Sequence, residues 1–235
     1  MRVDILTLFT DYFKTPFNSS ILKRAVNKKL LEIGLTDIRD FAVDKHGTVD
    51  DKPFGGGSGM IMKVDVLVPA LEQVLKFGEG QKAHKILLSP KGAIFNQKKA
   101  KSLAKKDWLI LICGHYEGVD GRFVDNFIDE EISIGDYILT GGEPAALVLI
   151  DTVARLIPKV LGDKESLKFE TFTRVKSGDR IQTILEYPQY TRPAKFRSLL
   201  VPKVLLSGDH KKIEKWRIKE ALKETRKKRP DLLKS

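Results

Sequence analysis

The sequence predicts an α/β fold with a parallel sheet, followed by a small, mainly helical C-terminal domain. Through the first two thirds, apolar runs of strand length alternate with longer segments of helical periodicity. Such alternation is typical of a parallel sheet covered by helices. The chain has 235 residues, 42% of them hydrophobic, which suffices for one sizeable core and a small second module.

Four short apolar runs predict the strands, at Val3–Phe9, Leu35–Phe41, His84–Leu88 and Trp108–Cys113. Four segments with helical periodicity alternate with them or follow them, at Asn18–Leu31, Val64–Leu75, Asn96–Lys105 and Pro144–Ile157. The last helix begins favourably, because an acid suits the positive end of the helix dipole and proline suits the first turn. One further strand-like run, Tyr137–Leu139, lies between the glycines of EISIGDYILTGGE at residues 131–143.

The composition changes after the first 160 residues. Residues 1–160 hold the predicted sheet, whereas residues 161–179 are polar and predict a linker. Residues 180–235 contain three prolines in short order and then a basic helix from Asp209, which predicts a small helical domain.

The chain is strongly basic, with a formal net charge of +11. Residues 211–235 contain 11 Lys or Arg and 4 Asp or Glu residues, so they contribute +7 of this total. Positive charge clustered in this way favours a polyanionic partner such as RNA or DNA.

Several classes of protein are disfavoured. A single cysteine, Cys113, can form neither an internal disulfide nor a thiolate metal cluster. The four histidines are not at metal-ligand spacing, so we expect no metal site. Asp4 interrupts the first apolar run, which argues against a signal peptide, and no apolar run approaches the ~20 residues of a membrane span. We therefore expect a cytoplasmic protein without a membrane partner.

Four stretches rich in glycine or proline are candidate ligand loops: 50–63, 88–92, 113–118 and 131–143. Three of them follow or contain a predicted strand, where α/β proteins place their ligand loops. The P-loop and G-x-G-x-x-G patterns are absent. Bare glycine backbone can instead read the edge of a planar purine, with Tyr116, Ile134 and Leu139 against its faces. Tight turns at strand ends remain the simpler explanation of each stretch taken alone.

Seven separated motifs together carry a resemblance to a known family. They are DDKPFGGGSGM, LSPKG, CGHYEGVD, EEISIGDYILTGGE, IDTVARLIP, PQYTRP and VPKVLLSGDHKKIEKWR. The order and the residues of these motifs resemble those of the TrmD family, bacterial tRNA (guanine-N1)-methyltransferases of the SPOUT superfamily. The resemblance implies a deep trefoil knot whose loops bind S-adenosylmethionine in a bent form. The cofactor pocket that it implies consists of Leu87, Leu88, Ser89, Pro90, Gly114, Tyr116, Glu117, Ser133, Ile134, Gly135, Asp136, Tyr137, Ile138, Leu139, Gly141 and Gly142.

The resemblance also implies the substrate and the assembly. The substrate is tRNA with a guanosine 3′ of the anticodon, accommodated by the loop around Gly59. The active site lies at the interface of a homodimer. Arg155 matches the arginine that stabilises charge developing on guanine, and its position also suits a cation at a helix C-terminus. The family is associated with magnesium, although the sequence shows no dedicated carboxylate cage.

The general base is where the sequence departs from the family. Glu170 stands where an aspartate is expected, and Asp179 is a weaker candidate. After GGE, Pro144-Ala145-Ala146 replaces Leu-Pro-Ala, and Lys91 and Phe54 are milder changes. An RNA-binding SPOUT protein without catalysis, or an enzyme acting on ribose 2′-OH, are therefore alternatives to the guanine-N1 methyltransferase.

Overall fold

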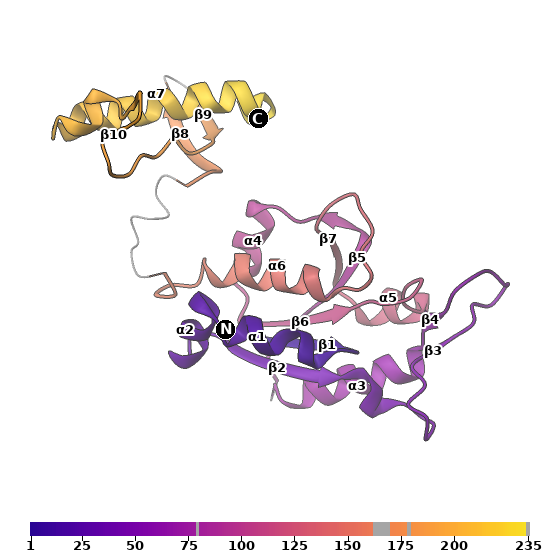
Figure 1. The fold of residues 1–235 in the computed structure, drawn as a ribbon. Helices are drawn as coiled ribbons and strands as arrows, with labels where there is room; N and C mark the ends of the chain where they lie inside the picture. The colour runs from indigo at the N-terminus through magenta and orange to yellow at the C-terminus, as the bar shows by residue number, and fades with distance from the viewer. Residues whose placement is uncertain (79, 162–169, 178–179, 234–235) are drawn as a thin grey trace. The chain divides into compact units, whose positions relative to one another are not determined.

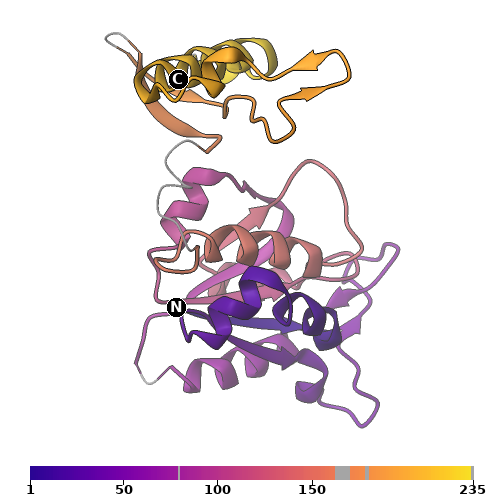
Figure 2. The ribbon, with the colours of Figure 1, turned by 60° about the vertical axis from the view of Figure 1, so that its left-hand side comes forward.

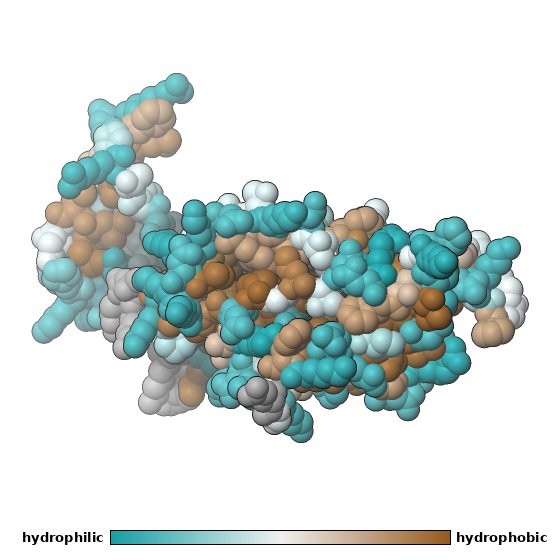
Figure 3. Space-filling model, turned by 90° about the horizontal axis from the view of Figure 1, so that it is seen from below, coloured by the Kyte–Doolittle hydropathy of each residue, from teal (hydrophilic) through white to brown (hydrophobic). Residues whose placement is uncertain are grey.

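The computed structural model describes residues 1–78, 80–161, 170–177 and 180–233 (Figure 1). The chain divides into two compact units, Met1–Gly162 and Asp163–Ser235, and each is described by itself. None of the helices in these ranges combines the length and hydropathy that crossing a membrane requires. On the face seen in Figure 3, apolar side chains reach the surface between clusters of hydrophilic ones.

A five-stranded sheet forms the centre of the first unit, and every neighbouring pair of its strands is parallel. The prediction of an α/β fold with a parallel sheet is confirmed. In spatial order the strands are β2 (Glu32–Asp37), β1 (Arg2–Thr7), β6 (Trp108–Cys113), β5 (His84–Ile94) and β7 (Glu130–Ser133).

Helices cover both faces of the sheet (Figures 1 and 2). On one face, Ile5 and Leu111 pack in a core with residues of α2 (Ser20–Asn27), α4 (Gln97–Leu103) and α6 (Glu143–Ala154). On the other, Leu6 and Ile110 pack with residues of α3 (Val64–Lys76) and α5 (Gly121–Phe127). The short α1 (Lys14–Phe17) and the 3₁₀ turn Thr10–Phe13 precede α2. Because alternate residues of the central strands face opposite cores, β6 is apolar throughout and Ile86–Leu88 of β5 are all buried.

A small hairpin projects from this unit. Its strands β3 (Asp50–Asp51) and β4 (Ile61–Met62) are antiparallel and enclose the glycine-rich loop. Four glycines of the loop have positive φ, and Phe54 at its tip is fully exposed.

Two local predictions in the first unit are wrong, and one helix was not predicted. The strand expected at Leu35–Phe41 ends at Asp37, whose side chain accepts from the amide of Arg39 and starts a 3₁₀ turn, Ile38–Phe41. Tyr137–Leu139 is not a strand, because pairing with β5 stops at Ser133. Helix α5 was not predicted at all, since its seven residues are too few for a clear helical period.

The second unit contains more strand than the sequence indicated. Strands β8 (Thr173–Ser177) and β9 (Arg180–Ile184) form an antiparallel hairpin, so β8 lies within the stretch expected to be a linker. A second hairpin joins β10 (Lys195–Phe196) and β11 (Leu199–Leu200). After the 3₁₀ turn Lys203–Leu206 comes the long helix α7 (His210–Lys228), which a last 3₁₀ turn, Pro230–Leu233, follows.

One side chain caps helix α7, and another attaches this helix to the segment after strand β9. Asp209 caps the helix by accepting from the amide of Lys212. The buried Thr225 hydroxyl donates to the carbonyl of Ala221 (2.7 Å) and accepts from the amide of Leu185 (2.9 Å). Helix α7 is thereby attached to the end of strand β9.

Candidate functional site

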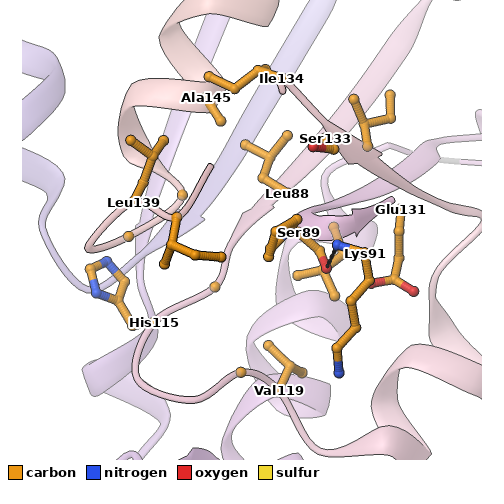
Figure 4. Close-up of a pocket in the computed structure, with 18 of the residues that line it drawn as sticks. Leu88, Ser89, Lys91, His115, Val119, Glu131, Ser133, Ile134, Leu139 and Ala145 are labelled. Carbon is orange, nitrogen blue, oxygen red and sulfur yellow. Dashed lines mark hydrogen bonds between the residues drawn. The ribbon is translucent and has the colours of Figure 1, made fainter. Parts of the chain in front are cut away.

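A cavity of about 390 Å³ opens where strands β5, β6 and β7 end (Figure 4). Its walls come from residues 87–91, 114–119, 131–135 and 137–142, with contributions from α5 and the start of α6. Ligands of open α/β sheets bind at the carboxyl ends of the strands, so this is the candidate site on topological grounds alone.

Fifteen of the sixteen residues expected to bind the cofactor line this one cavity. Asp136 is the residue that does not, and Ala145 lies in the wall as well. The sequence interpretation missed the rest of the lining: Lys91, His115, Gly118, Val119, Gly121, Val124, Asp125, Glu131, Ile132 and Thr140. Seven of these lie inside motifs already singled out, whereas Gly121, Val124 and Asp125 belong to the unpredicted helix α5.

Gly142 shows what bare backbone contributes to the site. Its amide donates to the carbonyl of Gly114 at 3.0 Å. A Cβ at this position would lie 2.7 Å from Cα of Cys113, closer than real contacts allow. The loop after β7 and the end of β6 therefore pass backbone against backbone, and only glycine permits that approach.

The loop 133–139 presents both polar backbone and apolar side chains to the cavity. The Ser133 hydroxyl donates to the carbonyl of Gly135 (3.0 Å), and the amide of Tyr137 donates to the same carbonyl (3.0 Å). Ile138 is 81% exposed and Leu139 is 41% exposed, so these side chains are not used in the core. Figure 4 shows Ile134 and Leu139 at the cavity wall. Apolar walls with a few fixed polar groups are typical of small-molecule sites.

A buried polar network supports the cavity from behind. The Thr7 hydroxyl donates to Oε1 of Glu143 at 2.5 Å, and Nε2 of His115 lies 2.7 Å from Oε2 of the same carboxylate. Glu143 is only 3% exposed. Burial acts to raise the pKa of Glu143, but the hydrogen bonds with His115 and Thr7 outweigh it and hold the pKa below its usual 4.5. The network ties β1 and the 114–119 loop to the start of α6.

We expect Glu143→Ala to destabilise the protein in a pH-dependent way. Because the pKa of Glu143 is lowered in the folded state, its stabilisation is present above the unfolded value and lost as pH falls through the folded value. Removing it should reduce the free energy of unfolding by about 1–3 kcal/mol at pH 7. Denaturant unfolding of the unmodified protein and of the variant, at pH 7 and at pH 4, measures the difference between their free energies of unfolding. This difference should be smaller at pH 4.

The matched control is Glu72→Ala, which removes an exposed acid from helix α3. It should change stability little at either pH. A Glu143→Ala deficit that stays constant between the two pH values would show that lost packing, and not the ionised network, is responsible.

Arg155 and Gly59 belong to the first unit but do not line the cavity. Arg155 follows the last turn of α6, ten residues beyond Ala145, which corresponds to about 15 Å along the helix. Gly59 packs on the cavity-lining Glu117, since a Cβ there would lie 2.2 Å from Cγ of Glu117. Glu170 belongs to the second unit, where its carbonyl accepts from the amide of Thr173 at 3.0 Å just before β8. Asp179 falls outside the described residues.

Metal ligation and thiol chemistry find little support at this site. Within the described ranges, no group of three or more His, Cys, Asp or Glu side chains could hold a metal ion. Cys113 ends strand β6 and is fully buried. Burial, with the nearby Glu143 carboxylate, raises the pKa of its thiol well above the usual value.

Sequence comparison with known proteins gives the family of the chain. The family model described as "tRNA (Guanine-1)-methyltransferase TrmD" matches residues 1–235. A tRNA (guanine-N(1)-)-methyltransferase of Carboxydothermus hydrogenoformans is 54% identical over 234 residues, covering 100% of this chain and 88% of the relative. Those of Dictyoglomus turgidum and Ruminiclostridium cellulolyticum are 54% and 50% identical, covering 99% of this chain and 90% and 96% of the relatives. The chain belongs to the TrmD family of tRNA (guanine-1)-methyltransferases.

Proposed function

We propose that the protein transfers a methyl group from S-adenosylmethionine to N1 of the guanosine 3′ of the anticodon in tRNA. Family membership over the whole chain supports guanine-N1 methylation, and the comparisons do not favour the alternatives of ribose methylation or RNA binding without catalysis. The observation that carries the cofactor assignment is the cavity formed by fifteen of the expected residues.

The cavity suits this cofactor chemically. Backbone groups of the loop 133–142 can read the edge of adenine, and Ile134 and Leu139 offer apolar contacts to its faces. When bound, the cofactor supplies an electrophilic methyl group. We also propose that the crossing of Gly142 over Gly114 belongs to a deep trefoil knot, because the two segments meet by a direct backbone hydrogen bond.

The chain must supply a base and a cation for the reaction. Guanine N1 carries a proton at neutral pH, so its lone pair becomes available only when a base takes that proton. We assign this role to the Glu170 carboxylate. Arg155 stabilises the negative charge that develops on the neighbouring carbonyl oxygen, and the loop around Gly59 accommodates the target base. A methylation assay with labelled cofactor and tRNA, followed by digestion and identification of the methylated nucleoside, tests the reaction.

We propose a homodimer whose active site lies at the subunit interface. Within one chain, Arg155 lies about 15 Å along α6 from the cavity-lining end of that helix. Val148 on α6 and Tyr12 on the adjoining 3₁₀ turn are 45% and 47% exposed, and exposed apolar side chains on packed elements are typical of an interface. A second copy on this face can bring its own linker acid to the cavity.

Mixing two inactive variants tests the shared site. We expect Glu170→Ala and Gly141→Val to regain activity together under conditions that exchange subunits. The heterodimer then holds one intact pocket facing one intact glutamate. If pocket and base came from the same subunit, every site would keep one lesion. Heterodimers that are confirmed by native mass spectrometry yet inactive would exclude the shared site.

We propose three regions with different roles: a knotted cofactor domain at residues 1–160, a linker with the base at 161–179, and a basic tRNA-binding domain at 180–235. Residues 163–235 contain twenty Lys or Arg and ten Asp or Glu residues, which accounts for +10 of the chain's +11. Helix α7 ends in consecutive basic residues, Arg226, Lys227 and Lys228, directly before Arg229.

Replacing Arg226, Lys227, Lys228 and Arg229 with glutamine should weaken tRNA binding and make the salt dependence of this binding shallower. Each phosphate that the protein no longer neutralises reduces the slope of log affinity against log salt concentration by roughly 0.9 on duplex regions. Filter binding across a salt series measures the slope, and calorimetry of the cofactor should show unchanged affinity. An unchanged slope would assign this cluster to a solvated surface.

A further inference from the structure

A bulge in strand β5 carries Lys91 to the cavity. Pairing between β5 and β7 is interrupted between Leu88 and Ala93, so residues 89–92 leave the ladder. Within the bulge the amide of Lys91 donates to the hydroxyl of Ser89 at 3.2 Å. The following Gly92 lies so close to β7 that a Cβ on it would be 2.4 Å from the backbone carbon of Glu131. The bulge thereby places Lys91 beside Glu131 on one wall of the cavity (Figure 4).

Charged side chains on this wall of the cavity are available to a ligand. Lys91 is the one Lys or Arg among the lining residues, whereas Glu117, Asp125 and Glu131 are acidic. Among the residues that the structure describes, neither the Lys91 ammonium nor the Glu131 carboxylate forms an ion pair. The preceding Glu130, in contrast, lies 2.7 Å from His84 and 2.5 Å from Lys99. The cavity wall therefore offers one cation and one half-buried anion side by side.

We propose that Lys91 binds the α-carboxylate and Glu131 the α-ammonium of the methionine end of S-adenosylmethionine. This inference rests on the proposed function. The loop 133–142 supplies the backbone groups for adenine, so the remaining wall is left for the amino-acid end of a bent cofactor. A neighbouring cation and anion match the two charges of that zwitterion, and hydrogen bonds between charged groups are the stronger kind. Lys91 and Glu131 would thus select ligands that carry the amino-acid end.

Two related ligands isolate this contact. S-adenosylhomocysteine and 5′-methylthioadenosine share the adenosine and a neutral thioether, but methylthioadenosine lacks the amino-acid end. By calorimetry, Lys91→Gln should bind S-adenosylhomocysteine about five- to tenfold more weakly, as expected for a partly exposed charge pair with hydrogen bonds. Its affinity for methylthioadenosine should change less than about twofold on the same basis. Glu131→Gln should show the same pattern.

Two further variants serve as controls. Lys91→Arg keeps the charge and should retain most of the affinity for S-adenosylhomocysteine. Lys98→Gln removes an exposed lysine from helix α4 outside the cavity and should affect neither ligand.

Each contrary outcome has a separate meaning. Equal losses for both ligands in Lys91→Gln would overturn the proposal, because they would assign Lys91 to the general shape of the pocket. Unchanged ligand affinities together with weaker tRNA binding would overturn it in favour of an RNA contact. If the unmodified protein bound neither ligand, the cofactor assignment itself would fail.

Discussion

We expect Glu170→Gln to lower the single-turnover rate of tRNA methylation at least about 100-fold, the lower end of what a positioned general base contributes. The substitution preserves size and hydrogen bonding but cannot accept the proton of guanine N1. Cofactor affinity should stay unchanged, because the substitution changes none of the residues that line the cavity. Rapid-quench kinetics with enzyme in excess over tRNA measures the chemical step directly.

Asp179→Asn provides the comparison, since Asp179 is the second candidate base in the predicted linker. It should lower the same rate much less. If the two effects are reversed, Asp179 is the base and the assignment of Glu170 is wrong. Glu170→Asp measures how closely the longer side chain is positioned, since a displacement of about 1 Å can cost on the order of a hundredfold in rate.

We expect Gly141→Val to lower the affinity for S-adenosylmethionine at least about 100-fold, or ~2.7 kcal/mol. A Cβ at Gly141 would lie 2.2 Å from Cε1 of His115 and 2.6 Å from Oε2 of Glu143. Those two side chains are already bonded to each other behind the cavity, so they cannot move aside without breaking the network. Isothermal titration calorimetry gives the affinity.

The fold of this variant should survive, because Gly141 lies in a loop outside the central sheet. Circular dichroism and the thermal unfolding midpoint serve as controls. Gly141→Ala adds the same Cβ without the branch and should lose less affinity. A folded Gly141→Val protein with normal affinity would show that the cofactor binds elsewhere.

The parts of the fold that the sequence predicted depend on local pattern. The run Trp108–Cys113 and the segment Ile86–Leu88 are apolar throughout because both faces of a central parallel strand are buried. Tyr137–Leu139 has the same apolar character for another reason, since its side chains line a cavity instead of a core. Composition cannot distinguish these two uses. The β8–β9 hairpin was missed because its sequence is charged and polar and lacks a clear alternation.

The candidate site was predictable where glycine marks close backbone approach, as at Gly142 against Gly114. Its support was not predictable, because Thr7 and Glu143 are 136 positions apart and only the folded sheet joins them. Lys91 and Glu131 become neighbours through a bulge that no local pattern announces.

Cys113 gives the protein an internal chemical reporter. It is the chain's one cysteine, it is fully buried, and it contacts the glycine backbone at the edge of the cavity. An alkylating reagent can modify this thiol only when β6 and the neighbouring loop open transiently, so the labelling rate follows the population of opened molecules. A ligand that holds the loop closed slows the labelling, and the mass of a single adduct then reports pocket occupancy without any radioactive methyl donor.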